Sequence, residues 1–152
     1  MSLGTKWRIS PFPDLHGIGG TKASGRWHSV GRPIVYLAES PASAMLETLV
    51  HLEMEAEDVP DGFNLIAVEI PASAEIYIPD DLPDDWYEDV EATREMGDVW
   101  LRDNETLLMR VPSAIMPHTQ NLLFNPAHPH AKEATLTYEE FILDRRLLGP
   151  RK

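Results

Sequence analysis

The sequence predicts a mixed α+β fold in one compact domain. A chain of 152 residues has the length of a single domain and can bury a substantial core. Apolar runs of strand character greatly outnumber the two segments with helical spacing. These segments follow no β-α-β alternation, and the chain lacks a GxGxxG motif, which disfavours a Rossmann sheet. Because no repeat or linker divides the sequence, we expect residues 1–152 to form one domain.

The first third of the chain alternates short strands with one long loop and one helix. Residues 6–9 are expected to form a strand, and 16–33 a glycine-punctuated loop of a length that is usually functional or disordered. A strand over 34–38 leads into Ser40-Pro41, an N-cap residue followed by proline at the first helical position. We expect a helix over 41–54, whose apolar residues share one face: Ala42, Met45, Leu46, Leu49 and Leu52.

The remainder of the chain is expected to be mostly strands, with one further helix. The helix is predicted over 90–102, and an acidic, turn-rich loop over 79–86 precedes it. The apolar segments that predict strands are 63–70, 74–78, 106–114, 121–125 and 134–143.

Composition and charge exclude several classes of function. The chain has no cysteine, which rules out disulfides and thiolate chemistry and favours the cytoplasm. No segment is apolar enough to span a bilayer. A net charge of −12 disfavours direct nucleic-acid binding. Sixteen acidic residues and one basic residue fall within 53–98, either as a solvated surface or as a docking face for a basic partner.

Several residues in polar or glycine-rich contexts are candidates for chemistry, and each also has a plain structural role. Glu47 lies on the side of its helix away from Leu49, where a carboxylate either faces solvent or serves a site. Arg26 lies between Gly25 and Gly31, and glycines allow positive φ or a close approach of the backbone to a ligand. The other candidates, read by default as core or turn residues, are Trp27, Tyr36, Ser113, Asn121 and Asn125.

Metal and serine-hydrolase chemistry have little support. Glu47 and His51 have ExxxH spacing, but the remaining histidines cluster only in sequence, so we expect no metal site. Ser113 is not part of a GxSxG motif, which argues against a serine-hydrolase nucleophile.

Taken together, these segments resemble the RES domain, the toxin half of bacterial toxin–antitoxin pairs. The resemblance runs from about residue 7 to 147 and rests on "SGRWHSVGRPIVYLAESPASAMLETLVH", "GDVWL", "RVPSAIMP" and "NLLFNPAHP", in family order. The arginine, glutamate and serine that name the family fall on Arg26, Glu47 and Ser113. Its tyrosine and asparagine fall on Tyr36 and Asn125, while His28 stands where asparagine is frequent.

The resemblance implies a fold similar to the diphtheria-toxin-type ADP-ribosyltransferases and an enzyme that consumes NAD+ as substrate, without a prosthetic group. Glu47 would face the ribose, Arg26 the pyrophosphate and Tyr36 the nicotinamide, while Ser113 and Asn125 would contribute hydrogen bonds. Water or phosphate would accept the ribosyl group. The alternatives are an ADP-ribosyltransferase that modifies a protein, and a non-catalytic protein-interaction domain.

The resemblance also implies a protein partner. We expect a cognate antitoxin with an Xre-like helix-turn-helix to hold this chain inactive in the cytoplasm. The sequence leaves open the acceptor and the oligomeric state, a homodimer included.

Overall fold

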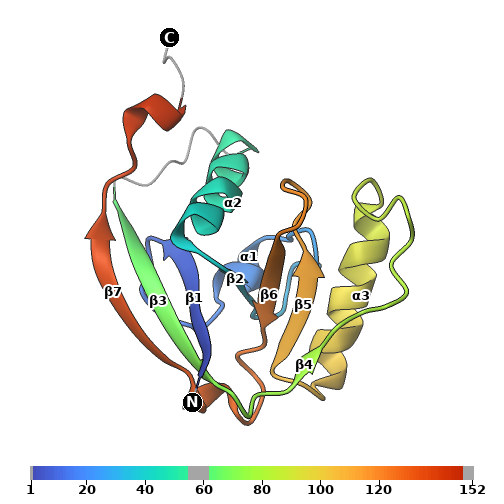
Figure 1. The fold of residues 1–152 in the computed structure, drawn as a ribbon. Helices are drawn as coiled ribbons and strands as arrows, with labels where there is room; N and C mark the ends of the chain where they lie inside the picture. The colour runs from blue at the N-terminus through green and yellow to red at the C-terminus, as the bar shows by residue number, and fades with distance from the viewer. Residues whose placement is uncertain (1, 55–61, 149–152) are drawn as a thin grey trace.

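A computed structural model of the chain describes residues 2–54 and 62–148 (Figure 1). Among these residues, seven strands form one sheet in the order β4-β5-β6-β2-β1-β3-β7. All neighbouring strands run antiparallel except β4 and β5, which are parallel. The strands are β1 Ser2–Ser10, β2 Val35–Ala38, β3 Phe63–Pro71, β4 Ile76–Tyr77, β5 Leu108–Pro112, β6 Gln120–Phe124 and β7 Thr135–Phe141.

In the described part of the chain, three α-helices accompany the sheet: α1 Gly19–Lys22, α2 Pro41–Met54 and α3 Val90–Asp103. The 3₁₀ turns Ala131–Glu133 and Arg145–Leu148 flank β7. The mixed α+β prediction is confirmed. None of the helices in the described ranges is long and apolar enough to cross a membrane.

The main departures from prediction are in two short elements. The glycine loop contains the four-residue helix α1, which the sequence does not predict. The helix begins with two glycines, and glycine is a poor helix former. The strand expected over 74–78 contracts to the two residues of β4. Of the acidic segment 53–98, residues 55–61 lie outside the described residues, and most of the carboxylate side chains in the described remainder are exposed.

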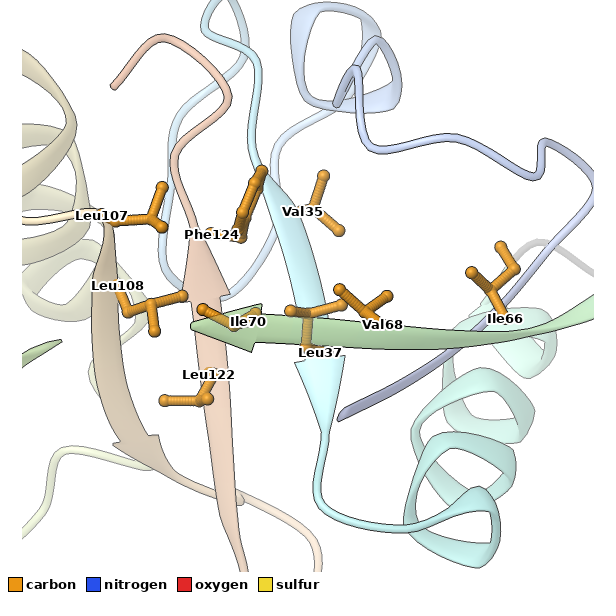
Figure 2. Close-up of a cluster of buried hydrophobic side chains, with 9 residues drawn as sticks. All are labelled: Val35, Leu37, Ile66, Val68, Ile70, Leu107, Leu108, Leu122 and Phe124. Carbon is orange, nitrogen blue, oxygen red and sulfur yellow. The ribbon is translucent and has the colours of Figure 1, made fainter. Parts of the chain in front are cut away.

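The main core lies where β3 crosses β2 and β6. In Figure 2, Val68 and Ile70 lie where β3 crosses β2 and β6, and Ile66 lies further along β3. The buried set comprises Val35, Leu37, Ile66, Val68, Ile70, Leu107, Leu108, Leu122 and Phe124. Because strand side chains alternate between faces, the residues between these on β2, β5 and β6 point to the opposite face of the sheet.

A second cluster covers that opposite face. Trp100 and Leu101 of α3 pack with Met109 and Val111 of β5 and with Leu123 of β6. Trp27 and Ile34, from the glycine loop and the residue before β2, complete the cluster. The face of β2, β5 and β6 that carries the candidate site residues is therefore shared between α3 and the Arg26 loop (residues 23–31).

Both long helices begin at side-chain caps. The Ser40 hydroxyl accepts a hydrogen bond from the Ser43 amide at 3.0 Å, which confirms the predicted start of α2. The Asp89 carboxylate accepts from the Ala92 amide at 3.0 Å and starts α3. Asn104 ends α3 in the left-handed region, at φ 55°.

Candidate functional site

Glu47 of α2 reaches the end of the sheet, where two side-chain donors hold one of its oxygens. The Ser113 hydroxyl, just after β5, donates to Glu47 Oε1 at 2.8 Å. The Asn121 amide, on β6, donates to the same oxygen at 2.9 Å. The carboxylate is half-buried and does not extend freely into solvent. Two of the residues predicted for the site, Glu47 and Ser113, therefore lie in direct contact.

Ser113 also organises the turn between β5 and β6. Its hydroxyl oxygen accepts from the amides of Ile115 and Met116 at 3.1 and 3.2 Å, and its own amide donates to the Thr119 carbonyl at 2.8 Å. A hydroxyl offers one donor and two acceptor positions, so all three are occupied here. Ser113 can contact a substrate directly only by giving up one of these bonds.

Tyr36 lies on the same face of the sheet as Asn121. It pairs with Leu123 of β6, and Ala38 pairs with Asn121, so Tyr36 and Asn121 are diagonal neighbours. The Cβ atoms of such neighbours lie roughly 7–8 Å apart. The residue is 36% exposed, although the Arg26 loop contacts its hydroxyl. Part of this aromatic residue is thus accessible from solvent.

The Tyr36 hydroxyl is bound to the Arg26 loop by two hydrogen bonds. It accepts from the Trp27 amide at 3.2 Å and lies 2.7 Å from His28 Nδ1. His28 Nε2 lies 3.0 Å from the Ala23 carbonyl, which can only accept, so Nε2 carries the proton. A neutral His28 then accepts from the Tyr36 hydroxyl at Nδ1.

Burial perturbs both members of this pair. Desolvation lowers the pKa of His28 below its usual value, against the opposing effect of hydrogen bonds and of Asp98. Desolvation likewise raises the pKa of Tyr36, so its phenol stays protonated. Both effects favour the neutral pair that the hydrogen bonds require.

Two glycines of the Arg26 loop serve different needs. A Cβ on Gly25 would lie 2.5 Å from the Tyr36 hydroxyl, so a side chain there would displace the tyrosine or the loop. Gly31 has φ +126°, which strains any residue with a side chain. The structure therefore provides both effects expected of these glycines, although the close approach at Gly25 is to Tyr36.

Three side chains of α3 make hydrogen bonds to the backbone of the Arg26 loop. The Thr93 hydroxyl donates to the Arg26 carbonyl at 2.6 Å, and Arg94 Nε donates to the Gly25 carbonyl at 2.7 Å. One turn further along, the Asp98 carboxylate accepts from the Ser29 amide at 2.8 Å.

Gly97 lies between these contacts and allows the backbones to meet. A Cβ built on it would lie 1.5 Å from the Trp27 carbonyl oxygen. The "GDVWL" segment thus brings α3 into direct contact with the loop that carries Arg26.

The Arg26 side chain points to the loop before α3. Its Nη1 donates to the Tyr87 carbonyl at 3.1 Å, and Trp86 stacks on Trp27 with ring centroids 5.8 Å apart. Trp86 and Tyr87 form one wall of a groove of about 290 Å³, and residues 112–120 form the other. Two of the residues that line this groove contact predicted site residues: Tyr87 accepts from Arg26, and Ser113 donates to Glu47.

A larger hollow of about 400 Å³ lies along the outer face of α3 and contains none of the predicted site residues. Its lining combines Glu91, Glu95 and Asp98 with Arg94 and Arg102. We take the smaller groove as the candidate site, because its lining residues Tyr87 and Ser113 contact Arg26 and Glu47.

Asn125 lies at the other end of β6 and makes structural contacts. Its amide donates to Asn104 Oδ1 at 2.9 Å and to the Leu101 carbonyl at 3.4 Å, and its oxygen accepts from the Ala127 amide at 3.1 Å. The side chain is 1% exposed, and its main partners belong to the end of α3. The structure does not bring Asn125 to Glu47; Asn121, which by default was read as a turn former, is there instead.

The described residues contain no group of three or more histidine, aspartate or glutamate side chains arranged to hold a metal ion. The rings of His128 and His130 are tilted by 34° with centroids 5.4 Å apart, and His130 Nδ1 lies 3.3 Å from Glu133 Oε1.

Comparison with known proteins identifies the class of protein to which this chain belongs. The chain belongs to the RES domain family, which matches residues 4–144.

Two curated relatives cover most of the chain. It is 49% identical over 141 residues to "Toxin Res" of Pseudomonas putida. This alignment covers 93% of this chain and 97% of the relative. It is 41% identical over 138 residues to a "Prs ADP-ribosylating toxin" of Sphingobium sp., covering 86% and 83%.

A solved structure shares the fold. The M. tuberculosis MbcT-MbcA toxin-antitoxin complex contains a chain that superposes with a TM-score of 0.69 over 95% of this chain and 86% of that one, at 17% identity.

Proposed function

We propose that this chain is a RES toxin that binds NAD+ and cleaves the bond between nicotinamide and ribose. The observation that carries the proposal is the Glu47 carboxylate, whose Oε1 is held by Ser113 and Asn121 beside the groove. A carboxylate fixed by two donors costs no reorganisation when a positive charge develops in front of it.

The chemistry requires little beyond such a carboxylate. As the N-glycosidic bond breaks, its electron pair goes to the nicotinamide nitrogen, and the nicotinamide leaves neutral. The ribosyl carbon acquires oxocarbenium character, which the Glu47 carboxylate stabilises. An acceptor oxygen then forms the new bond to that carbon and loses its proton.

Arg26 and Tyr36 are suited to hold the substrate for this step. Arg26 is fixed at its backbone by Thr93, and its guanidinium reaches the groove wall at Tyr87. A guanidinium pairs with pyrophosphate oxygens in two-point contacts. The solvent-accessible part of Tyr36 offers a stacking surface for nicotinamide.

Transfer to a protein side chain is the second candidate reaction, and one observation favours it. The Sphingobium relative carries the name of an ADP-ribosylating toxin. Water, phosphate and protein acceptors differ only in the product that carries the ADP-ribosyl group.

We further propose that a helix-turn-helix antitoxin controls the site by covering the groove. The fold relative was solved in a toxin–antitoxin complex. Tyr87 and Met116, on opposite walls of the groove, are 52% and 48% exposed and provide apolar surface for a partner.

The test is single-turnover cleavage of NAD+ by the purified protein, following nicotinamide and the adenine-containing product, with and without phosphate. Glu47→Gln should slow cleavage by about 10²–10³-fold and change NAD+ affinity far less, because the ground-state ribose carries no full charge. Glu140→Gln, an exposed glutamate on β7, is the matched control and should behave like wild type. Wild-type cleavage by a folded Glu47→Gln variant would refute the mechanism.

A further inference from the structure

We propose that Asn121 is a positioning residue that fixes the Glu47 carboxylate, an inference that rests on the proposed cleavage of NAD+. Asn121 donates to Glu47 Oε1 at 2.9 Å from β6, beside the Ser113 hydroxyl. With Oε1 bound twice, the carboxylate can turn neither to the Ser113 side nor to the Asn121 side. Its second oxygen, Oε2, is left for the ribosyl carbon.

The orientation of the Asn121 amide is set by Glu47. If the amide were turned over, its oxygen would lie at 2.9 Å from Glu47 Oε1, and two acceptors would face each other. The nitrogen must therefore point to the carboxylate, and Oδ1 must point away.

That orientation has an energetic cost for the folded protein. Asn121 Oδ1 is buried and accepts no hydrogen bond within the described part of the chain. A buried acceptor without a partner destabilises a fold, and such groups in native structures often mark functional sites.

Asn125 shows what a structural asparagine at this depth looks like. It lies at the other end of the same strand, and both ends of its amide are bonded to α3 or to the following turn. Within the described residues, the Asn121 side chain makes one hydrogen bond, and that bond is to the proposed catalytic carboxylate.

The first variant is Asn121→Leu, which replaces the amide with an apolar group of similar size on a strand. Because it removes the orphaned Oδ1 as well as the donor, its melting temperature should equal or exceed that of wild type. The single-turnover rate should fall about 10–10²-fold, as for other small misplacements of a reacting group, while KM changes less than about twofold.

The decisive measurement repeats the substitution in the Glu47→Gln background. A residue that acts through Glu47 has nothing left to position there, so the double variant should cleave at the rate of Glu47→Gln alone. Asn64→Leu is the matched control, because Asn64 is half-buried and its amide donates to the Ser10 and Pro11 carbonyls, away from Glu47. This control should lose stability and keep the wild-type rate.

Three results would overturn the inference: an unchanged rate for Asn121→Leu, the same fold-loss in both backgrounds, or a rate loss that tracks a loss of folded protein. Should the leucine variant fail to fold, Asn121→Asp keeps the shape and removes the donor, and the same comparison applies. If wild-type protein does not cleave NAD+, the proposed function itself fails. If it does and Asn121→Leu cleaves equally fast, only the role of Asn121 fails.

Discussion

Gly97→Ala tests whether the contact between α3 and the Arg26 loop positions Arg26. The added methyl group would lie 1.5 Å from the Trp27 carbonyl oxygen, a separation that no real contact tolerates. The neighbouring atom is backbone, so no side-chain rotation relieves the overlap. Helix and loop must move apart, and the three hydrogen bonds of Thr93, Arg94 and Asp98 must lengthen with them.

Two opposing terms set the magnitude. Alanine in a helix interior is favoured over glycine by about 1 kcal/mol. Overpacking of a closed contact costs about 1–3 kcal/mol, and loss of each neighbouring hydrogen bond adds about 1 kcal/mol. With the equivalent of one of the three hydrogen bonds lost, the net destabilisation should be about 1–3 kcal/mol, which lowers the melting temperature by roughly 2–12 °C in a domain of this size.

The assay pairs a thermal melt with NAD+ cleavage at a temperature where the variant is folded. Because the shift reaches Arg26 through its backbone, kcat/KM should fall at least about tenfold, mainly through KM. Gly19→Ala is the control: a Cβ there would meet no atom within 4 Å, and the melting temperature should be unchanged or slightly higher. If Gly97→Ala is as stable and active as wild type, the close packing of α3 on the loop does not position Arg26.

Two other substitutions test Arg26, the proposed partner of the pyrophosphate, and the buried His28. Arg26→Lys should raise KM for NAD+ at least about tenfold with little change in melting temperature, because a lysine cannot make a two-point contact with pyrophosphate; the exposed Arg32→Lys is its control, and equal KM values would remove Arg26 from the site. The lowered pKa of His28 means that the unfolded chain binds a proton first as pH falls, so His28 contributes stability fully above about pH 6.5 and loses it below. Melts across this range should show a shallower pH dependence for His28→Gln than for wild type, and parallel curves would contradict the neutral Tyr36–His28 pair.

The elements that the sequence predicted well are those with strong local signals. Ser40 and Pro41 mark the start of α2, and α3 runs to Asp103 against a predicted end at residue 102. The strands were predicted within a few residues of their observed ends. The extra length of β1, which begins at Ser2, depends on its pairing with β3 in the interior of the sheet and carries no local signal.

The site was predictable only in part, for physical reasons. Motif context brought Arg26, Tyr36, Glu47 and Ser113 forward, and the structure places all four around one face of the sheet. Asn121 was named as a candidate but interpreted as a turn residue, because its contact with Glu47 joins positions 74 residues apart and has no local signal. The available signal was an asparagine near the start of the otherwise apolar strand β6.

The contacts of Glu47 also govern when the site can exist during synthesis. Glu47 is made early, but its partners Ser113 and Asn121 lie 66 and 74 residues later. β1 likewise has neighbouring strands on both sides only after β3 has been synthesised. A growing chain at about 5–20 residues per second therefore spends several seconds with Glu47 present and unsupported. Truncated products that end before residue 121 contain the glutamate without its anchors, so an activity that depends on these anchors can arise only after residue 121 has been added.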